Sequence, residues 1–318
     1  MMVGTTSGHP MIELRRLHRH FGRTRAVDDV SFEVPQGTVF GYIGPNGAGK
    51  TTSMRILATL DLPTYGDALV DGFSVVNDPD RVRRRLGFMP DYFGTYPNVD
   101  CYEYLDFFAR AYGLVGRERH QALRHTMSFT GLDQLAQKPI RGLSKGMKQR
   151  LCLGRAMIHN PSVLVLDEPA AGLDPRARIE LREMIRQLAT AGKTVLVSSH
   201  ILTELAEMCD QVGIIEQGRL LVTGAVSDMQ RALTTHSEVT LRVLGGGETL
   251  CQWLSQRTDV RNVSVDGELV HLIHDGGRES QADFLKEVIL VGFRIAAFGS
   301  RQKSLEDVFL QVTRGAVQ

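Results

Sequence analysis

The 318-residue sequence predicts an α/β domain with a mainly parallel sheet, followed by a small α+β domain. Strand-like and helix-like segments alternate as far as residue 223, which is typical of a sheet covered by helices on both faces. Beyond about residue 225 the order of segments changes. The length also favours two domains, because a domain usually has about 150 residues. A composition of 42% apolar and 23% charged residues is that of a globular protein.

The first domain is expected at residues 11–225, after a flexible tail at 1–10. Wholly apolar runs predict strands buried on both faces, and apolar residues spaced three or four apart predict helices. In chain order, we expect a strand at 38–43, a helix at 51–60, a helical subdomain at about 91–159 and a strand at Val163–Leu166. The next expected helix has its apolar stripe at Leu181, Met184, Ile185, Leu188 and Ala189, and it should end at Gly192. After it we expect a strand at 194–197, a helix at 201–209 and a strand at 212–215.

A linker is expected at 226–236 and the second domain at 237–318. Alternating or helical spacing predicts a strand at 239–243, a helix near 250–254, strands at 260–265 and 268–273, a helix at 284–289, a strand at 293–297 and a final helix at 305–312. Asp266-Gly267 between the two middle strands favours a tight hairpin turn. The order strand, helix, strand, strand, helix, strand predicts a ferredoxin-like arrangement.

Charge and hydropathy exclude several classes of protein. Lysine and arginine (37) nearly balance aspartate and glutamate (36), so no strong overall field attracts nucleic acid or an anionic membrane. The longest unbroken apolar runs have four residues, whereas a membrane-spanning helix needs about 20. The four cysteines lie far apart in the sequence and form no C-x-x-C pair. We therefore expect reduced core thiols in a cytosolic protein.

Residues 44–51, Gly-Pro-Asn-Gly-Ala-Gly-Lys-Thr, fit the phosphate-loop pattern G-x-x-x-x-G-K-[ST] between an expected strand and an expected helix. Glycines let backbone N–H groups and the helix N-terminus face a negative charge. In this pattern Lys50 reaches the β- and γ-phosphates, and the Thr51 hydroxyl binds Mg²⁺. The alternative is a glycine-rich turn that binds nothing. Agreement of the pattern with its flanking elements favours a nucleoside triphosphate.

The apolar run Val163–Leu166 ends in Asp167-Glu168-Pro169. A carboxylate at the end of a buried strand is costly without a cation, and Mg²⁺ would supply one for Asp167. Glu168 follows, where a base can activate water against the γ-phosphate. The alternative is an acidic turn in solvent, but the phosphate loop upstream favours the catalytic interpretation.

Further segments resemble motifs of the ATP-binding cassette (ABC) ATPases. Residues 143–150, LSKGMKQR, are similar to the signature motif, whose common form is LSGGQ. Residues 171–174, AGLD, resemble the D-loop, and 198–200, SSH, resemble the switch-histidine segment. Phe21 matches the aromatic residue that stacks on adenine. The resemblance covers about residues 11–225. Residues 304–310, SLEDVFL, are similar to the end of the small C-terminal domain of daunorubicin-resistance-like exporter ATPases.

The resemblance implies a P-loop NTPase cassette with added N-terminal antiparallel strands, which binds and hydrolyses ATP with Mg²⁺. The implied catalytic residues are Glu168, His200 and Lys50, and the implied Mg²⁺ ligands are Thr51, Asp91 and Asp167. The implied ATP-binding residues are Phe21, Gly44, Pro45, Asn46, Gly47, Ala48, Gly49, Lys50, Thr51, Thr52, Ser144 and Gly146.

The resemblance also implies partners. Two such ATPases, identical or related, pair head to tail and enclose two ATP molecules between phosphate loops and signature motifs. The pair drives a separate integral-membrane permease, so the chain would lie in the cytoplasm, on the inner face of the membrane. No nucleic-acid partner is expected. Drugs, antibiotics, lipids and polysaccharides all remain open as transported substrates.

Several positions depart from the family pattern, among them Phe21, which replaces the commoner tyrosine and can still stack. Asp91 in Met89-Pro90-Asp91-Tyr92 stands where the Q-loop glutamine is usual. In the signature motif, Lys145 replaces the first glycine and Met147 replaces the glutamine, whereas Ser144 and Gly146 are retained. Aspartate is shorter than glutamine and carries a charge, so the role of the loop in coupling to a permease is open.

Two other functions compete with that of an exporter subunit. A soluble ABC ATPase that acts on ribosomes or DNA usually has two cassettes or a coiled-coil insertion, and the sequence shows neither. A regulator without turnover is disfavoured by Glu168 and His200. A GTPase is disfavoured because no N-K-x-D segment is present.

The pairs His18 with His20 and His271 with His274 are expected on the surface, because no cysteine or acidic cluster completes a metal site.

Overall fold

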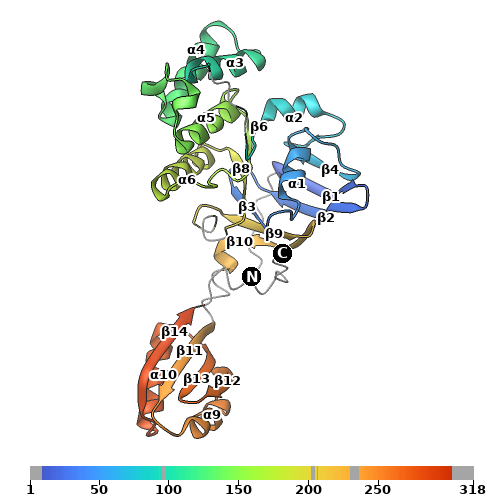
Figure 1. Cartoon of the computed structure of the whole chain (residues 1–318). Helices are drawn as coiled ribbons and strands as arrows, with labels where there is room; N and C mark the ends of the chain where they lie inside the picture. The colour runs from blue at the N-terminus through green and yellow to red at the C-terminus, as the bar shows by residue number, and fades with distance from the viewer. Residues whose placement is uncertain are drawn as a thin grey trace. The chain divides into compact units, whose positions relative to one another are not determined.

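The computed structural model describes residues 9–92, 94, 98–201, 205, 207–229 and 236–302, with the backbone alone at 236 and 302. The chain divides into two compact units, residues 1–224 and 225–318 (Figure 1). The tail and the final helix expected from the sequence fall wholly or largely outside the described residues, and the helix at 201–209 and the linker fall partly outside them. No helix in the described ranges is both long and apolar enough to cross a bilayer.

Six strands form the central sheet of the first unit, in the order β10-β9-β3-β8-β7-β6. Their bounds are β3 (Val39–Ile43), β6 (Leu86–Met89), β7 (Val163–Leu166), β8 (Thr194–Ser199), β9 (Gln211–Glu216) and β10 (Arg219–Ala225). The four pairs from β9 to β6 are parallel. Strands β3, β7 and β8 are buried along their whole length. The predicted α/β fold with a mainly parallel sheet is therefore confirmed.

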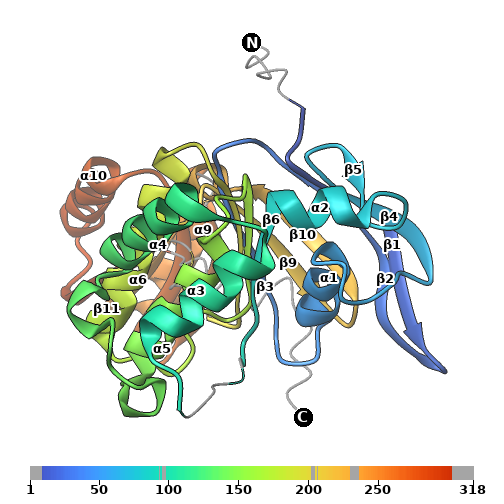
Figure 2. The same ribbon diagram turned by 90° about the horizontal axis from the view of Figure 1, so that it is seen from above.

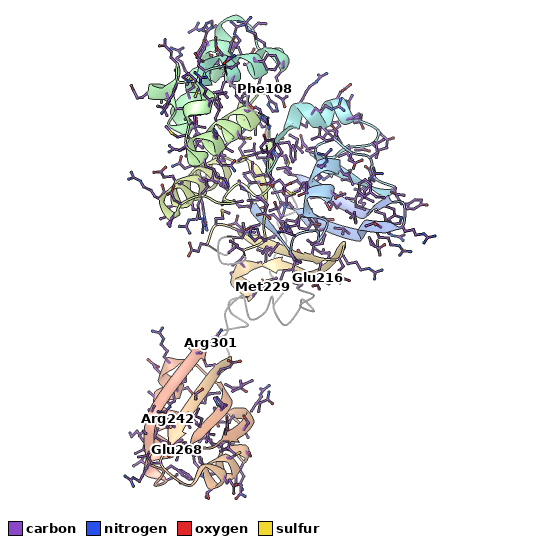
Figure 3. All side chains as sticks on the ribbon, in the orientation of Figure 1. Phe108, Glu216, Met229, Arg242, Glu268 and Arg301 are labelled. Atoms are coloured by element: carbon purple, nitrogen blue, oxygen red, sulfur yellow. The ribbon has the colours of Figure 1, made fainter. Side chains whose placement is uncertain are left out.

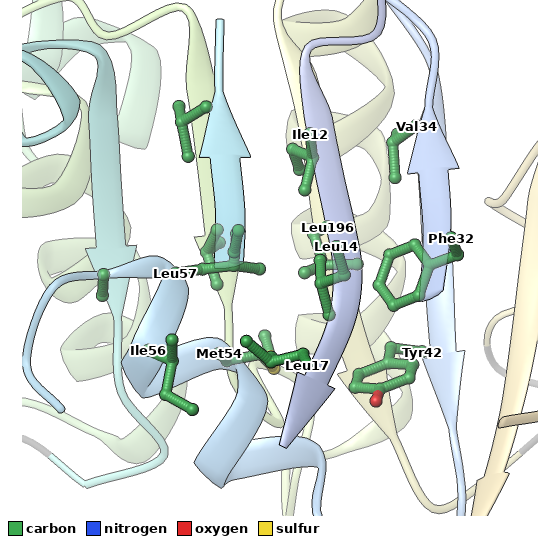
Figure 4. Packing of buried hydrophobic residues seen from close by; sticks show 14 of the residues in the cluster. Ile12, Leu14, Leu17, Phe32, Val34, Tyr42, Met54, Ile56, Leu57 and Leu196 are labelled. Carbon is green, nitrogen blue, oxygen red and sulfur yellow. The ribbon is translucent and has the colours of Figure 1, made fainter. Parts of the chain in front are cut away.

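A second, antiparallel sheet has the order β2-β1-β4-β5. It consists of β1 (Ile12–Phe21), β2 (Thr24–Val34), β4 (Tyr65–Val70) and β5 (Phe73–Ser74). Leu14 and Leu17 of β1 share one buried cluster with Phe32, Tyr42 and Met54 (Figure 4). This cluster joins the antiparallel sheet to β3 and to the first helix, so burial of apolar surface fixes the phosphate loop between the two sheets.

The helices of the first unit are α1 (Lys50–Leu57), α2 (Pro79–Arg85), α3 (Cys101–Ala111), α4 (Gly116–Thr130), α5 (Lys145–Met157) and α6 (Pro175–Thr190), with short 3₁₀ helices at Asp133–Leu135 and Ile140–Gly142. Helix α1 ends at Leu57, earlier than the expected end at residue 60. The reason is local: Thr59 has φ +58°, in the left-handed region that a helix cannot continue through. Helix α6 begins with Asp174 as its cap, whose carboxylate accepts the Ala177 N–H at 3.0 Å.

Helices α3, α4 and α5 lie between β6 and β7 in the chain, although these strands are neighbours in the sheet. They gather on the side of the first unit away from β1, β2 and β4 (Figures 1 and 2). Asp100 and Glu103 form a reciprocal capping box at the start of α3. The three helices share their own buried cluster, with Phe108 packed against it (Figure 3). The helical insertion expected between two core strands is present.

The second unit has the order β11 (His236–Val243), α9 (Gly247–Ser255), β12 (Val260–Asp266), β13 (Leu269–Asp275), α10 (Arg278–Leu290) and β14 (Ile295–Gln302). Its four-stranded sheet, β12-β13-β11-β14, is antiparallel throughout. Gly267 has φ +60° in the turn between β12 and β13, a conformation that glycine adopts at little cost. The predicted ferredoxin-like arrangement is confirmed.

Two expectations for the histidines and one for the cysteines are wrong. His274 is fully buried rather than on the surface, because it faces the apolar side of the second sheet beside Phe284. His18 and His20 do have an acidic neighbour, Asp28, which comes later in the sequence and reaches them across the β1–β2 pair. All four cysteines are free thiols, but Cys251 is only half-buried.

Close packing of α5 on the central sheet generates a test of the fold. A Cβ added to Gly87 in β6 would lie 1.9 Å from the Ala156 carbonyl oxygen of α5. We expect Gly87→Ala to lower the free energy of unfolding of the first unit by about 1–3 kcal/mol, measured by chemical denaturation. Gly142→Ala is the matched control, because its Cβ would meet only the Lys138 side chain at 3.6 Å. Equal denaturation midpoints for the two variants would contradict this packing.

Candidate active site

The phosphate loop joins β3 to α1, and its glycines are required by close backbone contacts. Gly47 and Gly49 have φ +80° and +105°, which residues with a side chain rarely adopt. A Cβ on Gly44 would lie 2.2 Å from the Ile215 carbonyl oxygen, and one on Gly49 would lie 2.4 Å from the Ala26 carbonyl oxygen. The loop is thus fitted between β9 and β2, and it leads into the N-terminus of α1.

Lys50 is the first residue of α1, and its side chain is buried. Its ammonium group donates to the carbonyl oxygens of Gly44 at 2.6 Å and Pro45 at 3.2 Å. It also lies 3.4 Å from Oε1 of Glu168. A buried cation is costly without acceptors. These three oxygens hold the positive charge against the phosphate loop, where the sequence pattern places it.

Asp167 follows β7 and is almost fully buried. The Ser198 hydroxyl donates to Asp167 Oδ1 at 2.7 Å and accepts the Glu168 N–H at 2.8 Å. Burial raises the pKa of Asp167 above its usual value; hydrogen bonds from Ser198 and Thr51 oppose this, and the charges of Glu168 and Asp91 add to it. The carboxyl group therefore lies where a cation would favour its ionised form.

The oxygens around Asp167 fit a magnesium ion. Asp167 Oδ2 is buried and has no hydrogen-bond partner among the described residues, and Oε1 of Glu168 makes only the ion contact with Lys50. Mg²⁺ prefers carboxylate and hydroxyl oxygens and binds through one or two carboxylates. Thr51 and Asp91 lie close enough to act on Asp167 electrostatically or by hydrogen bonding. These residues supply the hard ligands that the ion requires.

Glu168 is held from both sides. Its Oε2 lies 2.9 Å from Nδ1 of His200, whose side chain is 44% exposed. Its backbone has φ +47°, in the left-handed region that is uncommon for residues other than glycine. The strained backbone and the two side-chain contacts fix the carboxylate between Lys50 and His200. Three residues from separate parts of the sequence are thereby brought together.

Most of the residues that the sequence assigned to the site line a cavity of about 180 Å³. It is lined by Ala26, Asn46, Gly47, Ala48, Gly49, Lys50, Thr51, Thr52, Asp91 and Glu168. Phe21 is not among these lining residues; it lies at the end of β1, 49% exposed, with the Arg19 guanidinium 4.4 Å from its ring centroid. One aromatic face therefore carries a cation, and half of the side chain is open to solvent.

Ser144 and Gly146 do not line the cavity either. Ser144 caps α5, and its hydroxyl accepts the Met147 N–H at 3.3 Å. A Cβ on Gly146 would lie 3.1 Å from the Ala177 side chain, so α5 begins close against α6. The two residues form the N-terminus of a helix, where a negative charge is favourable, on a different part of the first unit.

Ser198 and Ala26 belong to the site, although the sequence did not assign them to it. Ser198 connects Asp167 with Glu168, and Ala26 lines the cavity. Ser198 was recoverable: it directly follows the strand predicted at 194–197, and the carboxyl ends of neighbouring parallel strands meet at one edge of a sheet. The Ala26 carbonyl oxygen has no such signal, because its role depends on the path of β2 past Gly49.

Comparisons with known proteins agree with these assignments of the fold. The family model described as ABC transporter matches residues 27–171. Nod factor export ATP-binding protein I of Ralstonia nicotianae is 32% identical over 317 residues, covering 98% of this chain and 95% of the relative. Linearmycin resistance ATP-binding protein LnrL of Bacillus subtilis is 29% identical, covering 95% of this chain and 98% of the relative.

Solved structures resemble about 70% of this chain. An ATP-binding subunit of an ABC transporter is 30% identical, with a TM-score of 0.63, over 70% of this chain and 92% of that chain. A dimeric ATP-binding cassette in a post-hydrolysis state with ADP and phosphate is 24% identical, with a TM-score of 0.61, over 68% of this chain and 99% of that chain. At 24% identity, the second structure shows only that the fold is shared.

Ser198 generates the prediction for this site. Ser198→Ala removes a hydrogen bond that lowers the pKa of Asp167, so this pKa should rise further. A carboxyl group binds metal in its ionised form, and loss of such a supporting contact costs about 10-fold to 100-fold in metal affinity. We expect that loss for Mg²⁺, measured by calorimetric titration with a non-hydrolysable nucleotide, and we expect it to grow as the pH falls.

Ser199→Ala is the matched control for this measurement, because the Ser199 hydroxyl accepts the Ile201 N–H at 3.0 Å. Its Mg²⁺ affinity should stay close to that of the wild type at every pH. The assignment of Ser198 would be wrong if the two variants bound Mg²⁺ alike.

Proposed function

The chain belongs to the ABC transporter family of ATP-binding proteins, and from this premise we propose that it is the ATP-hydrolysing subunit of an exporter, which powers a separate membrane permease. ATPase activity is that of the family. The observation that carries the assignment of residues is the position of Glu168, held between Lys50 and His200 beside the buried carboxylate of Asp167.

Binding of the nucleotide phosphates rests on the phosphate loop. Backbone N–H groups of the glycine-rich turn and the N-terminus of α1 face the cavity with partial positive charge. The Lys50 ammonium group has two loop carbonyl oxygens as its present partners. In the complex it would direct its charge to the β- and γ-phosphates. Phe21, half exposed at the end of β1, would stack on the adenine.

Thr51, Asp91 and Asp167 would hold Mg²⁺, which when bound supplies charge neutralisation for the phosphates. The free Oδ2 of Asp167 supports this assignment. Asp91 lines the cavity, and its charge contributes to the raised pKa of Asp167. An aspartate at this position therefore acts on the same carboxylate that the ion would contact, although its side chain is shorter than the usual glutamine.

Glu168 would take the proton from the attacking water. Its Oε2 contacts His200 and its Oε1 contacts Lys50, so the carboxylate has a fixed direction before the substrate arrives. General base catalysis by such a positioned group typically contributes about 10²–10⁴-fold to a rate. The side chain of His200 is 44% exposed, and it would contact the γ-phosphate.

A second copy, or a related cassette, would complete the site. Ser144 and Gly146 lie outside the cavity that contains Lys50, yet they begin a helix whose N-terminus favours anions. Head-to-tail pairing would bring this helix N-terminus to the ATP held by the other subunit. Closure on ATP and reopening after hydrolysis would then move the helices of the permease.

The direction of transport is proposed from the relatives. Two relatives that match nearly the whole chain are named for Nod factor export and for linearmycin resistance. The first name supports export, and the second supports resistance to an antibiotic as one use of it. The chain would lie in the cytoplasm at the inner face of the membrane. The alternative, a soluble ABC ATPase that acts on ribosomes or DNA, has no support among these names.

For catalysis, we expect Glu168→Gln to lower steady-state ATP turnover by about 10²–10⁴-fold while ATP affinity is retained. Glutamine keeps the size and hydrogen bonding of the side chain but cannot accept the proton. Phosphate release and equilibrium ATP binding would be measured on the full chain. Glu183→Gln, on the exposed face of α6, is the control and should match the wild type. Undiminished turnover in Glu168→Gln would remove Glu168 from the role of base.

For the partner, we expect a membrane permease to co-purify with the full chain, tagged and extracted from cells in detergent. Lys50→Ala should retain the permease. This change removes the buried positive charge that would contact the nucleotide phosphates, and it leaves the outer surface of the protein unaltered. Recovery of ribosomes or DNA in place of a membrane protein would contradict the exporter assignment and favour the alternative.

A further inference from the structure

Two histidines and an aspartate form a cluster outside the proposed ATP site. His18 and His20 lie on β1, and Asp28 lies on the neighbouring strand β2. The β1–β2 pairing is irregular at this point, yet the rings of His18 and His20 lie edge to face with their centroids 5.9 Å apart. One potential ligand atom from each of the three side chains lies within 4.8 Å of the other two. The proposed activity has no use for this arrangement.

The distances within the cluster suit a metal ion. Nδ1 of His18 lies 3.4 Å from Oδ1 of Asp28. Two ligands of a tetrahedral zinc ion are separated by about 3.4 Å, given metal–ligand bonds of about 2.0–2.1 Å. Nε2 of His20 is buried and has no hydrogen-bond partner in the described part of the chain. A buried ring nitrogen without a partner is costly, and a metal ion would satisfy it.

Each of two ligands also has an outer contact that would orient it. Oδ2 of Asp28 accepts two hydrogen bonds from the Arg219 guanidinium, at 3.0 and 2.7 Å, which leaves Oδ1 directed at His18. Nε2 of His18 lies 3.7 Å from Oδ1 of Asp29. Metal-bound histidines commonly donate their second N–H to a carboxylate, and Asp29 Oδ1 lies on that side of the His18 ring, just beyond hydrogen-bond distance. The ion would replace the weak 3.2 Å hydrogen bond from the Asp29 N–H to His18 Nδ1.

The donor set selects the kind of ion. Two imidazole nitrogens and one carboxylate suit zinc, whereas Mg²⁺ and Ca²⁺ prefer sites made of oxygen atoms. The guanidinium groups of Arg219 and Arg25 lie beside Asp28 and offset its charge, so the preference for zinc would rest on the two imidazole nitrogens. We propose that His18, His20 and Asp28 bind one Zn²⁺ ion, with a fourth position left for water.

The position of the cluster links it to the phosphate loop. The Asp28 N–H donates to the Gly218 carbonyl oxygen at 2.8 Å, and the Gly218 N–H donates to the Ala48 carbonyl oxygen at 2.9 Å. Phe21 directly follows His20 on β1. An ion that ties β1 to β2 would therefore restrict Phe21 and Ala48 together. Zn²⁺ should change ATP affinity through the backbone while staying outside the ATP cavity.

The test titrates Zn²⁺ alone into the full chain by calorimetry, without nucleotide. The wild type should bind one Zn²⁺ per chain at this site, and His18→Asn and His20→Asn should each lose at least about 10-fold to 100-fold in affinity. His125→Asn removes an exposed histidine far from the cluster in the sequence and is the matched control. Zn²⁺ binding equal in all four proteins, or absent from the wild type, would overturn the proposal.

A second measurement uses only the wild type, so it remains valid even if a variant folds poorly. Co²⁺ in place of Zn²⁺ on the wild type should give visible bands of a tetrahedral ion without the near-ultraviolet charge-transfer bands of a thiolate ligand. Thiolate bands would place the ion on a cysteine and overturn the proposal. Because neither readout depends on turnover, failure of the zinc site and failure of the ATPase assignment are distinguishable.

Discussion

Two opposite charges buried at the carboxyl edge of the central sheet constrain the rest of the first unit. Lys50 is 5% exposed and Asp167 is 1% exposed. Charges removed from water are stable only when partners are held in place around them. Loop carbonyl oxygens surround the ammonium group, and Ser198 binds the carboxylate. Strands β3, β7 and β8 must therefore end at the same level, and their parallel register achieves this: Ile43 pairs with Ser199, and Leu166 pairs with Val197.

The same edge explains why three distant sequence motifs form one site. The phosphate loop follows β3, and the two carboxylates follow β7. Ser198 lies in the last two residues of β8, and His200 follows that strand. Side chains that would be separated by more than a hundred residues in an unfolded chain meet because adjacent parallel strands present their carboxyl ends together. Packing of Leu17, Phe32 and Met54 supports this edge from the antiparallel sheet. The chemistry thus depends on strand register as much as on the motifs.

Much of the fold and most of the site could be predicted from sequence, because the responsible signals are local. Apolar runs such as Val163–Leu166 mark buried strands, and the phosphate-loop pattern specifies its own flanking elements. What escaped prediction depends on contacts between distant segments. The burial of His274 and the approach of Asp28 to His18 arise from strand pairing, which hydrophobic periodicity does not report. The early end of α1 depends on one backbone angle at Thr59.

The left-handed backbone at Glu168 has a consequence for how this enzyme can evolve. Strained φ/ψ values cost about 1–3 kcal/mol and persist only where the surroundings enforce them. Glycine or asparagine at this position would relax the backbone and add stability, but neither supplies the carboxylate. Selection for robustness and selection for turnover therefore oppose each other at a single residue. Thermostable descendants that keep hydrolysis would have to gain their stability elsewhere, whereas a cassette released from catalysis could gain it here.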